Sequence, residues 1–296
     1  MADVSKMNLL RKYGITYFLL TLIIAAGFIW YAIFKLEAQQ QLRLTVFNIG
    51  QGDSIFIEAP NGNQVLIDGG PSGAVLGKLG GVMPLWDRSI DLIVLTHPHA
   101  DHVVGLVEVL KRYDVGMVLE SGVNYSTVEY REWRALLKQK HIPVMIARAG
   151  QKMRLAKNIE LDIFTPFDSF IEKSPSNAHD AMVVSKLIYA SSSILLTGDA
   201  EKQIEYRLIL SGADLKSDVL KVGHHGSKTS TTEDFVRAVS PGYAVISVGK
   251  KNRYGHPYQQ TLDTLAKFNI KTFRTDLDGD VEFVSDGRKF ERVGVQ

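Results

Sequence analysis

The sequence predicts an α/β domain, with sheets covered by helices, that follows a single N-terminal transmembrane helix. Three observations lead to this prediction. An uncharged apolar stretch of 20 residues lies near the N-terminus, short β-type segments alternate with amphipathic helical segments after it, and 45% hydrophobic with 22% charged residues describe a globular protein. The length of 296 residues suits one large domain with an appendage. We expect an N-terminal cytoplasmic tail and anchor in residues 1–36, a linker in 37–41 and one folded domain in 42–296.

The apolar stretch, Ile15–Phe34, is long enough to cross a bilayer, because a helix rises ~1.5 Å per residue and the hydrocarbon layer is about 30 Å thick. Basic residues are more frequent before the stretch than after it: Lys6, Arg11 and Lys12 precede it, and Lys35 follows. This asymmetry predicts a single-pass protein of the cell membrane, with the N-terminus in the cytoplasm and the chain after Glu37 on the extracytoplasmic side.

An uncleaved anchor has two alternatives. A core helix of a soluble protein would have similar composition, and a cleaved signal peptide would have similar basic flanks. The stretch has no Ala-x-Ala pattern at its outer end and is longer than a usual signal core. The sequence therefore favours an anchor that interacts with the membrane through one helix.

Charge and cysteine content limit the possible partners and cofactors. Residues 1–35 contain four of the 34 basic and one of the 32 acidic residues, which leaves 30 and 31 in the remainder. The nearly neutral remainder gives no support of its own for a polyanionic partner. The chain contains no cysteine, so disulfides, thiolate metal sites and a cysteine nucleophile are excluded, and any metal must be bound by histidines and carboxylates.

The segments after the linker begin with strands. Leu42–Ile49 and Ser54–Ala59 read as an antiparallel pair, and Gln64–Ile67 follows after the hairpin signal Pro60-Asn61-Gly62-Asn63. The glycine-rich stretch Gly69–Gly81 reads as a loop. Further strands are predicted at Ile90–Leu95, Val115–Leu119, Ile142–Ile146, Ile159–Phe164, Met182–Tyr189, Ile194–Leu196, Val219–Val222, Tyr243–Val248, Lys271–Arg274 and Val281–Val284. Helices are predicted at Val103–Tyr113, Val128–Lys140, Glu201–Leu210, Thr232–Ala238 and Gln259–Phe268.

Three imidazoles and a carboxylate lie within six residues, directly after the apolar strand that ends at Leu95: His97, His99, Asp101 and His102. Alternate positions on a turn can converge on one point, and a nitrogen and oxygen ligand set of this kind suits zinc, manganese or iron. A chance surface cluster is the alternative. The chain has only eight histidines, and three of them in one short run make chance a poor explanation.

The run His97-Pro98-His99-Ala100-Asp101-His102 resembles the signature of the metallo-β-lactamase superfamily. Three other segments resemble further motifs of that family and follow in its order: Ile67-Asp68-Gly69-Gly70, Leu195-Leu196-Thr197-Gly198-Asp199-Ala200 and Val222-Gly223-His224-His225-Gly226-Ser227. This resemblance implies a four-layer αββα sandwich with the site along one sheet edge.

A more specific resemblance is to the hydrolase domain of ComEC-type competence proteins. It rests on Val46-Phe47-Asn48-Ile49-Gly50-Gln51-Gly52-Asp53, Thr229-Ser230-Thr231 and Asn252-Arg253-Tyr254-Gly255-His256-Pro257, and it extends from about Leu42 to Val293. ComEC proteins have many membrane helices that form a DNA channel, whereas this chain has one. The chain therefore resembles a standalone, membrane-anchored version of the hydrolase domain.

The resemblance also implies how two divalent cations, Zn²⁺ or Mn²⁺, would be bound. His97 and His99 would bind the first, Asp101 and His102 the second, and Asp199 would lie between them. A histidine of the pair His224 and His225 would complete the second site. Because successive residues of a strand point to opposite faces, one would bind metal while the other touches substrate or supports a ligand, and His225 is favoured as the ligand.

Four other residues are assigned roles with an alternative for each. His179 stands near the place where many superfamily members have another ligand, although ComEC-like sequences often have Asn there, so it is either a third ligand of the first metal or a loop histidine. His256 is a substrate contact or proton donor, or else part of a structural loop. Asp68 is expected to brace the site by hydrogen bonds, with metal binding as the alternative. Asp53 lies near the site mouth or serves a turn.

The expected function is an extracytoplasmic phosphodiesterase or nuclease, acting on single-stranded DNA or another phosphodiester. Two cations about 3.5–4 Å apart would lower the pKa of a shared water, and the resulting hydroxide would attack phosphorus. His224 or His256 would protonate the leaving group, and Asp101 would orient the nucleophile. Four basic residues near the site motifs would form a local rim for a polyanion: Lys228, Lys250, Lys251 and Arg253.

Other functions fit the same residues. The same fold hydrolyses other esters, lactones or β-lactams, since a fold does not determine a substrate. A non-catalytic binding module is the alternative from another class, and it is disfavoured because every expected ligand type is present. The sequence indicates no protein partner.

Overall fold

The computed structural model describes residues 2–38 and 41–294, and within the first helix it describes the side chains of residues 13–31. The chain divides into two compact units, Met1–Gln41 and Leu42–Gln296. In the first unit, helix α1 (Ala2–Ala38) contains a candidate membrane span at Tyr13–Tyr31 whose side chains are exposed. The basic side chains that predict its orientation, at positions 6, 11, 12 and 35, lie outside the described side chains.

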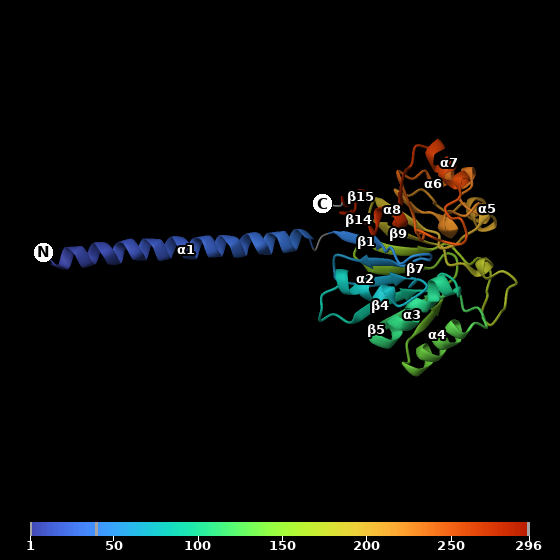
Figure 1. Ribbon diagram of the computed structural model, residues 1–296, viewed down its shortest axis with the longest axis horizontal. Coiled ribbons are helices and arrows are strands. Elements are labelled where there is room, and N and C mark those ends of the chain that lie inside the picture. The colour runs from blue at the N-terminus through green and yellow to red at the C-terminus, as the bar shows by residue number, and fades with distance from the viewer. Residues whose placement is uncertain (1, 39–40, 295–296) are drawn as a thin grey trace. The chain divides into compact units, whose positions relative to one another are not determined.

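In the second unit, the first sheet forms around the strands that open the domain (Figure 1). Its strands, in spatial order, are β15 (Phe290–Arg292), β14 (Val281–Ser285), β1 (Leu42–Val46), β2 (Ile55–Glu58), β3 (Gln64–Ile67), β4 (Ser89–Val94), β5 (Asp114–Glu120) and β6 (Val144–Ile146). β1 pairs antiparallel with β2, as predicted, whereas β3, β4, β5 and β6 run parallel.

The second sheet contains strands from the middle and the end of the chain. Its spatial order is β13 (Lys271–Arg274), β12 (Tyr243–Ile246), β11 (Val219–Lys221), β10 (Ser192–Leu196), β9 (Ser185–Tyr189), β8 (Ile159–Ile163) and β7 (Lys152–Ala156). β10, β11, β12 and β13 run parallel, and β7 to β10 are antiparallel neighbours.

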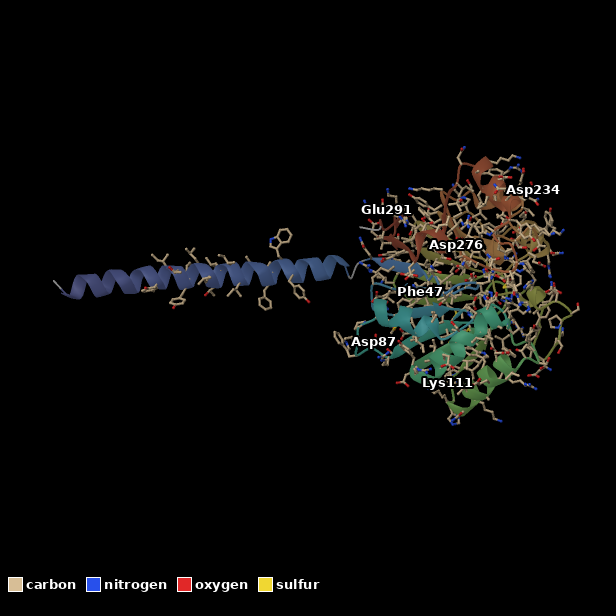
Figure 2. The ribbon with its side chains drawn as sticks, viewed as in Figure 1. Phe47, Asp87, Lys111, Asp234, Asp276 and Glu291 are labelled. Atoms are coloured by element: carbon tan, nitrogen blue, oxygen red, sulfur yellow. The ribbon has the colours of Figure 1, made fainter. Side chains whose placement is uncertain are left out.

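Helices cover the outer face of each sheet. α2 (Ala74–Val82), α3 (Ala100–Arg112) and α4 (Val128–Gln139) pack on the first sheet, and α5 (Lys202–Leu210), α6 (Glu233–Val239) and α7 (Gln259–Lys267) pack on the second. Short helical turns complete the connections: η1 (Ala178–Ala181), η2 (Gly223–Gly226) and α8 (Thr275–Asp278). Figure 2 shows Lys111 of α3 and Asp234 of α6 extending on opposite sides of the two sheets.

An apolar layer between the sheets holds the sandwich together. Leu44 and Val46 of β1 meet Leu187 of β9 and Ile194 of β10 in this layer, and all four are almost fully buried. In strands β4 and β10 the opposite face is apolar as well, because Ile93 and Leu195 pack against the helices. This arrangement confirms the predicted αββα class.

Three local predictions differ from the structure. The stretch read as a loop, Gly69–Gly81, contains helix α2, which forms because Val75 and Leu79 are fully buried against the first sheet despite the low helix propensity of glycine. Strands β7 and β15 had no predicted counterpart. Helix α3 begins at Ala100, before the predicted start, so Asp101 and His102 lie in its first turn.

The parallel strands determine where polar side chains gather. The carboxyl ends of β3 and β4 lead to Asp68 and to the His97–His102 run, and the carboxyl ends of β10 and β11 lead to Asp199 and to the histidine pair. Parallel strands of one sheet end at the same edge, which is where α/β proteins bind ligands. The two sheets thus contribute chemically reactive residues from both sides of the sandwich.

Candidate metal centre

The loop between β4 and α3 positions the residues from the first sheet. His97 is almost completely buried, His99 is the extended residue that precedes α3, and Asp101 and His102 follow in the first helical turn. The turn around Gly52 packs directly against this loop, because a β-carbon on Gly52 would lie 2.2 Å from the backbone oxygen of Asp101. Glycine at this position therefore allows the turn after β1 to approach the site closely.

The second sheet supplies the other side of the site. Asp199 follows β10, His179 lies in η1, and His224 and His225 lie in η2. The two adjacent histidines both have left-handed backbone angles, φ 47° and 55°. The prediction that this pair lies on a strand, with alternate faces, is therefore wrong. The two side chains nevertheless differ in burial, because that of His225 is 2% exposed and that of His224 is 23% exposed.

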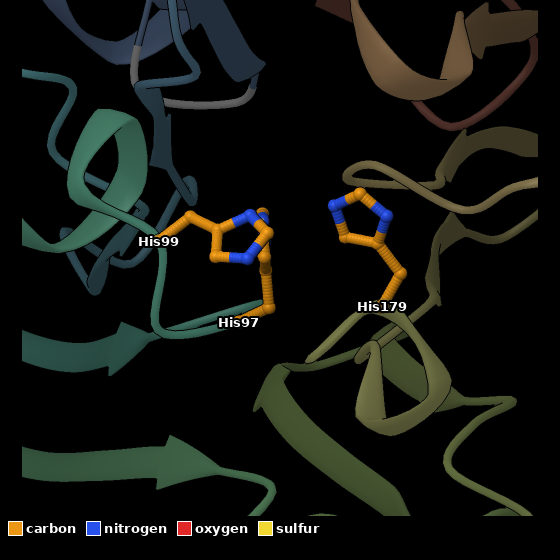
Figure 3. A group of neighbouring side chains, drawn as sticks. All are labelled: His97, His99 and His179. Carbon is orange, nitrogen blue, oxygen red and sulfur yellow. The ribbon is translucent and has the colours of Figure 1, made fainter. Parts of the chain in front are cut away.

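A first ligand group consists of His97, His99 and His179, whose nearest ring nitrogens lie within 4.8 Å of one another. Figure 3 shows the ring of His179 facing those of His97 and His99 from the opposite side. Nε2 of His97 lies 2.9 Å from Nδ1 of His99. Among the described residues, Nε2 of His179 is buried and has no hydrogen-bond partner. The structure thus brings His179, whose role the sequence left open, to the two histidines of the first group.

A second ligand group consists of Asp101, His102, Asp199 and His225. Nε2 of His102 lies 3.4 Å from Oδ2 of Asp199, and Nε2 of His225 lies 3.4 Å from Oδ1 of Asp199 and 3.4 Å from Oδ2 of Asp101. Oδ2 of Asp199 also lies 3.9 Å from Nε2 of His97 in the first group. Asp199 is therefore the residue that reaches both groups.

The polar atoms of both groups fit divalent cations. Within the described part of the chain, Nε2 of His102, Nε2 of His225 and Oδ1 of Asp199 are buried without a hydrogen bond. Buried polar atoms are nearly always satisfied, so several unsatisfied atoms converging on one place indicate a missing partner. Imidazole nitrogens and carboxylate oxygens, without thiolates, are a ligand set for Zn²⁺, Mn²⁺ or Fe²⁺.

Two carboxylates outside the ligand groups orient the histidines. Oδ2 of Asp68 lies 2.8 Å from Nδ1 of His102 and accepts a 2.6 Å hydrogen bond from the hydroxyl of Thr96, as expected for a bracing residue. Glu201 has no counterpart among the predicted site residues. Its carboxylate oxygens lie 3.4 Å from Nδ1 of His224 and 3.8 Å from Nδ1 of His179. Its position two residues after Asp199 is the signal that could have pointed to it.

His224 and His256 lie at the exposed side of the centre. Nε2 of His224 lies 3.9 Å from Oδ2 of Asp199, and the ring of His256 lies 5.6 Å from that of His224. Burial, together with the neighbouring His225 and His224, lowers the pKa of His256 to about 4. His256 is therefore neutral near pH 7, which suits a substrate contact better than a proton donor.

The two ligand groups differ in their protonation. Burial lowers the pKa of His97 well below its usual value, that of His99 to about 4, and that of His179. Burial acts in the same direction on His102 and His225, but the carboxylate of Asp199 and its neighbours outweigh it and raise the pKa of both well above the usual value. At neutral pH the first group is neutral and the second retains protons.

We predict that cation binding by the second ligand group weakens steeply as pH falls, whereas binding by the first group depends much less on pH near neutrality. A cation must displace protons from His102 and His225, so affinity should change by about tenfold per pH unit for each proton displaced. Calorimetric titration with Mn²⁺ between about pH 6 and 8, in buffers of different ionisation enthalpy, counts these protons. Equal proton release from both sites would contradict the prediction.

Comparisons with known proteins give the family context of this site. The family model described as the metallo-β-lactamase superfamily matches residues 48–250. ComE operon protein 3 of Bacillus subtilis is 30% identical over 267 residues, which cover 84% of this chain and 33% of that protein. Competence protein ComA of Neisseria gonorrhoeae is 29% identical over 269 residues, which cover 88% of this chain and 35% of that protein. The chain spans about a third of the length of these curated relatives.

A solved structure shares the fold. CmlA, a diiron β-hydroxylase from Streptomyces venezuelae, matches with a TM-score of 0.53 at 13% identity, over 85% of this chain and 54% of that one. At this identity the match describes the arrangement of sheets and helices alone.

Proposed function

The chain belongs to the metallo-β-lactamase superfamily, and on that premise we propose that it is a two-metal phosphodiesterase on the extracytoplasmic side of the cell membrane. The predicted resemblance to ComEC-type competence proteins is confirmed by the relatives, so the chain is a superfamily hydrolase related to competence proteins. The phosphodiester substrate, the two-metal chemistry and the side of the membrane form the proposal. α1 would anchor the chain, and single-stranded DNA is the substrate that we propose, since a competence protein is among the relatives.

The position of Asp199 between two ligand groups supports two cations better than one. His97, His99 and His179 would hold the first cation, Asp101, His102 and His225 would hold the second, and Asp199 would contact both. Two such cations supply an activated water and stabilise the negative charge that develops on a phosphodiester oxygen. Zn²⁺ and Mn²⁺ both accept this nitrogen and oxygen ligand set.

The remaining residues would orient the substrate and move a proton. His224 directs Nε2 towards the centre while Nδ1 faces the carboxylate of Glu201. As an imidazolium paired with that carboxylate, it would give its Nε2 proton to the leaving oxygen. His256, neutral near pH 7, would donate or accept a hydrogen bond to substrate. Asp101, whose side chain is 29% exposed, would orient the nucleophile at the open side.

A basic loop supports a polyanionic substrate. Lys250, Lys251 and Arg253 are exposed, and the Arg253 guanidinium lies 5.1 Å from the ring of Tyr254. That ring stacks on His256 with 5.7 Å between ring centroids. The loop that presents these residues is held by Asn252, which hydrogen-bonds the backbone of His256 through both its amide nitrogen and its amide oxygen. Ring contacts through Tyr254 and His256 therefore connect Arg253 to His224 at the centre.

The substrate class is tested with the full chain in detergent micelles, supplied with Mn²⁺ or Zn²⁺. We expect hydrolysis of single-stranded DNA and of bis-p-nitrophenyl phosphate, and no hydrolysis of the β-lactam nitrocefin. Cleavage of nitrocefin alone would favour the alternative hydrolase. Equal activity of wild type and His99→Ala, or no metal bound after loading, would reject metal-dependent catalysis.

The basic loop gives a separate prediction. Replacing Lys250, Lys251 and Arg253 together by alanine should raise KM for single-stranded DNA roughly tenfold, because phosphate contacts are lost, and should reduce its salt dependence. The small substrate bis-p-nitrophenyl phosphate reaches only the metal centre, so its kinetics should not change. A matched triple alanine variant of Lys152, Arg154 and Lys157, on the β7–β8 hairpin, is the control. Equal losses with both substrates would assign the loop a structural role instead.

A further inference from the structure

A buried lysine lies beneath the metal centre and is used by none of the steps above. Nζ of Lys221 lies 2.8 Å from Oδ2 of Asp53, and the side chains are 0% and 1% exposed. The ammonium also donates to the backbone oxygen of Val222 at 3.0 Å. Removing two charges from water costs several kcal/mol per ion, and a buried pair is weak evidence for stability by itself. A fully buried ion pair at this place therefore calls for a local role.

The pair links the two sheets at the edge that carries the ligands. Asp53 belongs to the turn between β1 and β2 of the first sheet, and Lys221 is the last residue of β11 in the second. Val219, two positions earlier on β11, faces the apolar layer between the sheets, and Lys221 projects from the same face of the strand. The ammonium thus reaches Asp53 across the interior of the sandwich.

Asp53 connects this pair to a residue of the second ligand group. Its other oxygen, Oδ1, lies 3.4 Å from Nδ1 of His225, and this nitrogen also lies 2.9 Å from the backbone oxygen of Ser247. Two oxygens next to Nδ1 favour the tautomer with its proton on that nitrogen. Nε2 is then free to accept a cation, on the side that faces Asp101 and Asp199.

The ammonium of Lys221 lies where the carboxylates beneath the centre could otherwise attract a further cation. Asp53, Asp68 and His102 place ligand atoms within 4.8 Å of one another. Asp68 is engaged by His102 and Thr96, and Asp53 by the ammonium of Lys221. The lysine supplies the positive charge at this place, so Asp53 is left to orient His225.

We propose that the Lys221–Asp53 pair is a positioning element of the second metal site, which keeps Nε2 of His225 directed at the second cation. Asp53, in the motif Gly50-Gln51-Gly52-Asp53, is then neither a residue of the site mouth nor a simple turn former. The proposal rests on the two-metal function proposed above. It predicts that the two sites respond differently to loss of the pair, because no hydrogen bond or ion pair joins Lys221 or Asp53 to the described side chains of the first ligand group.

Metal titration of the full chain in detergent micelles tests the proposal, with Mn²⁺ as the probe and a chelating dye as competitor. Asp53→Asn retains the shape of the side chain but not its charge. We expect it to weaken the second binding event by about 10–100-fold, the usual effect of losing a carboxylate behind a ligating histidine, and to leave the first unchanged. The double variant Asp53→Asn/Lys221→Met removes both buried charges, so it should regain thermal stability without regaining affinity.

Several outcomes separate this role from a structural one. Wild-type affinity for both cations in Asp53→Asn, or in the double variant, would overturn the proposal, as would an equal loss at both sites. Lys186→Met is the matched control, because Lys186 is another nearly buried strand lysine whose ammonium pairs with Asp214 instead. It should change stability but neither metal affinity. A wild-type chain that binds no Mn²⁺ would reject the proposed function, whereas two bound cations with an unaffected Asp53→Asn would reject only this inference.

Discussion

Asp199→Asn is expected to abolish the second bound cation, weaken the first, and lower kcat/KM by at least about a thousandfold, which corresponds to ~4 kcal/mol of transition-state stabilisation. The reason is that Oδ2 of Asp199 lies 3.4 Å from Nε2 of His102 and 3.9 Å from Nε2 of His97, one from each ligand group. Replacing the carboxylate by an amide removes a negative charge that two cations would share. Metal content by elemental analysis and hydrolysis of bis-p-nitrophenyl phosphate measure the two effects.

The matched control for this variant is Asp180→Asn. Asp180 is exposed and lies next to His179 in η1, so it experiences the same local structure without reaching the ligand groups. It should retain metal and activity. Two bound cations and near wild-type activity in Asp199→Asn would exclude a shared carboxylate and with it the arrangement of the two sites.

Alanine variants of the adjacent histidines His224 and His225 should have different effects, one on catalysis and the other on metal binding. His225→Ala should lose the second cation together with activity, because its buried Nε2 faces Asp101 and Asp199. His224→Ala should retain both cations and lower kcat for DNA by about 10²–10⁴-fold, the range for loss of a positioned proton donor. The loss should be much smaller with bis-p-nitrophenyl phosphate, whose leaving group departs without a proton.

Comparing activity on DNA with activity on bis-p-nitrophenyl phosphate separates loss of a proton donor from misfolding, because a misfolded variant would lose activity on both substrates. Glu201→Gln should reproduce the effect of His224→Ala in milder form, because the carboxylate of Glu201 lies 3.4 Å from Nδ1 of His224. A His224→Ala variant that loses metal, together with a His225→Ala variant that keeps it, would reverse the assignment. Equal losses with both leaving groups would remove proton donation from the role of His224.

The candidate membrane helix, the α/β class and the His97–His102 run were accessible from the sequence because they depend on local patterns. A long apolar stretch, alternation along strands and ligands on one turn after a strand all involve neighbouring residues. The family resemblance then predicted that Asp199 and the histidine pair lie beside this run. The helix α2 was missed because burial of Val75 and Leu79 overrides the glycines around them, which no local pattern reveals.

By itself, then, the sequence determined the candidate membrane helix, the α/β class and the residue types of a metal centre without cysteine, and its family resemblance implied the αββα arrangement. Only the tertiary structure decided that His179 joins His97 and His99, that His225 is the buried member of its pair, and that Glu201 and the Lys221–Asp53 pair stand behind the histidines. The physical reason is that these contacts join two sheets whose strands are far apart in the chain. Their distances follow from how the sandwich packs, and no spacing within a single segment encodes them.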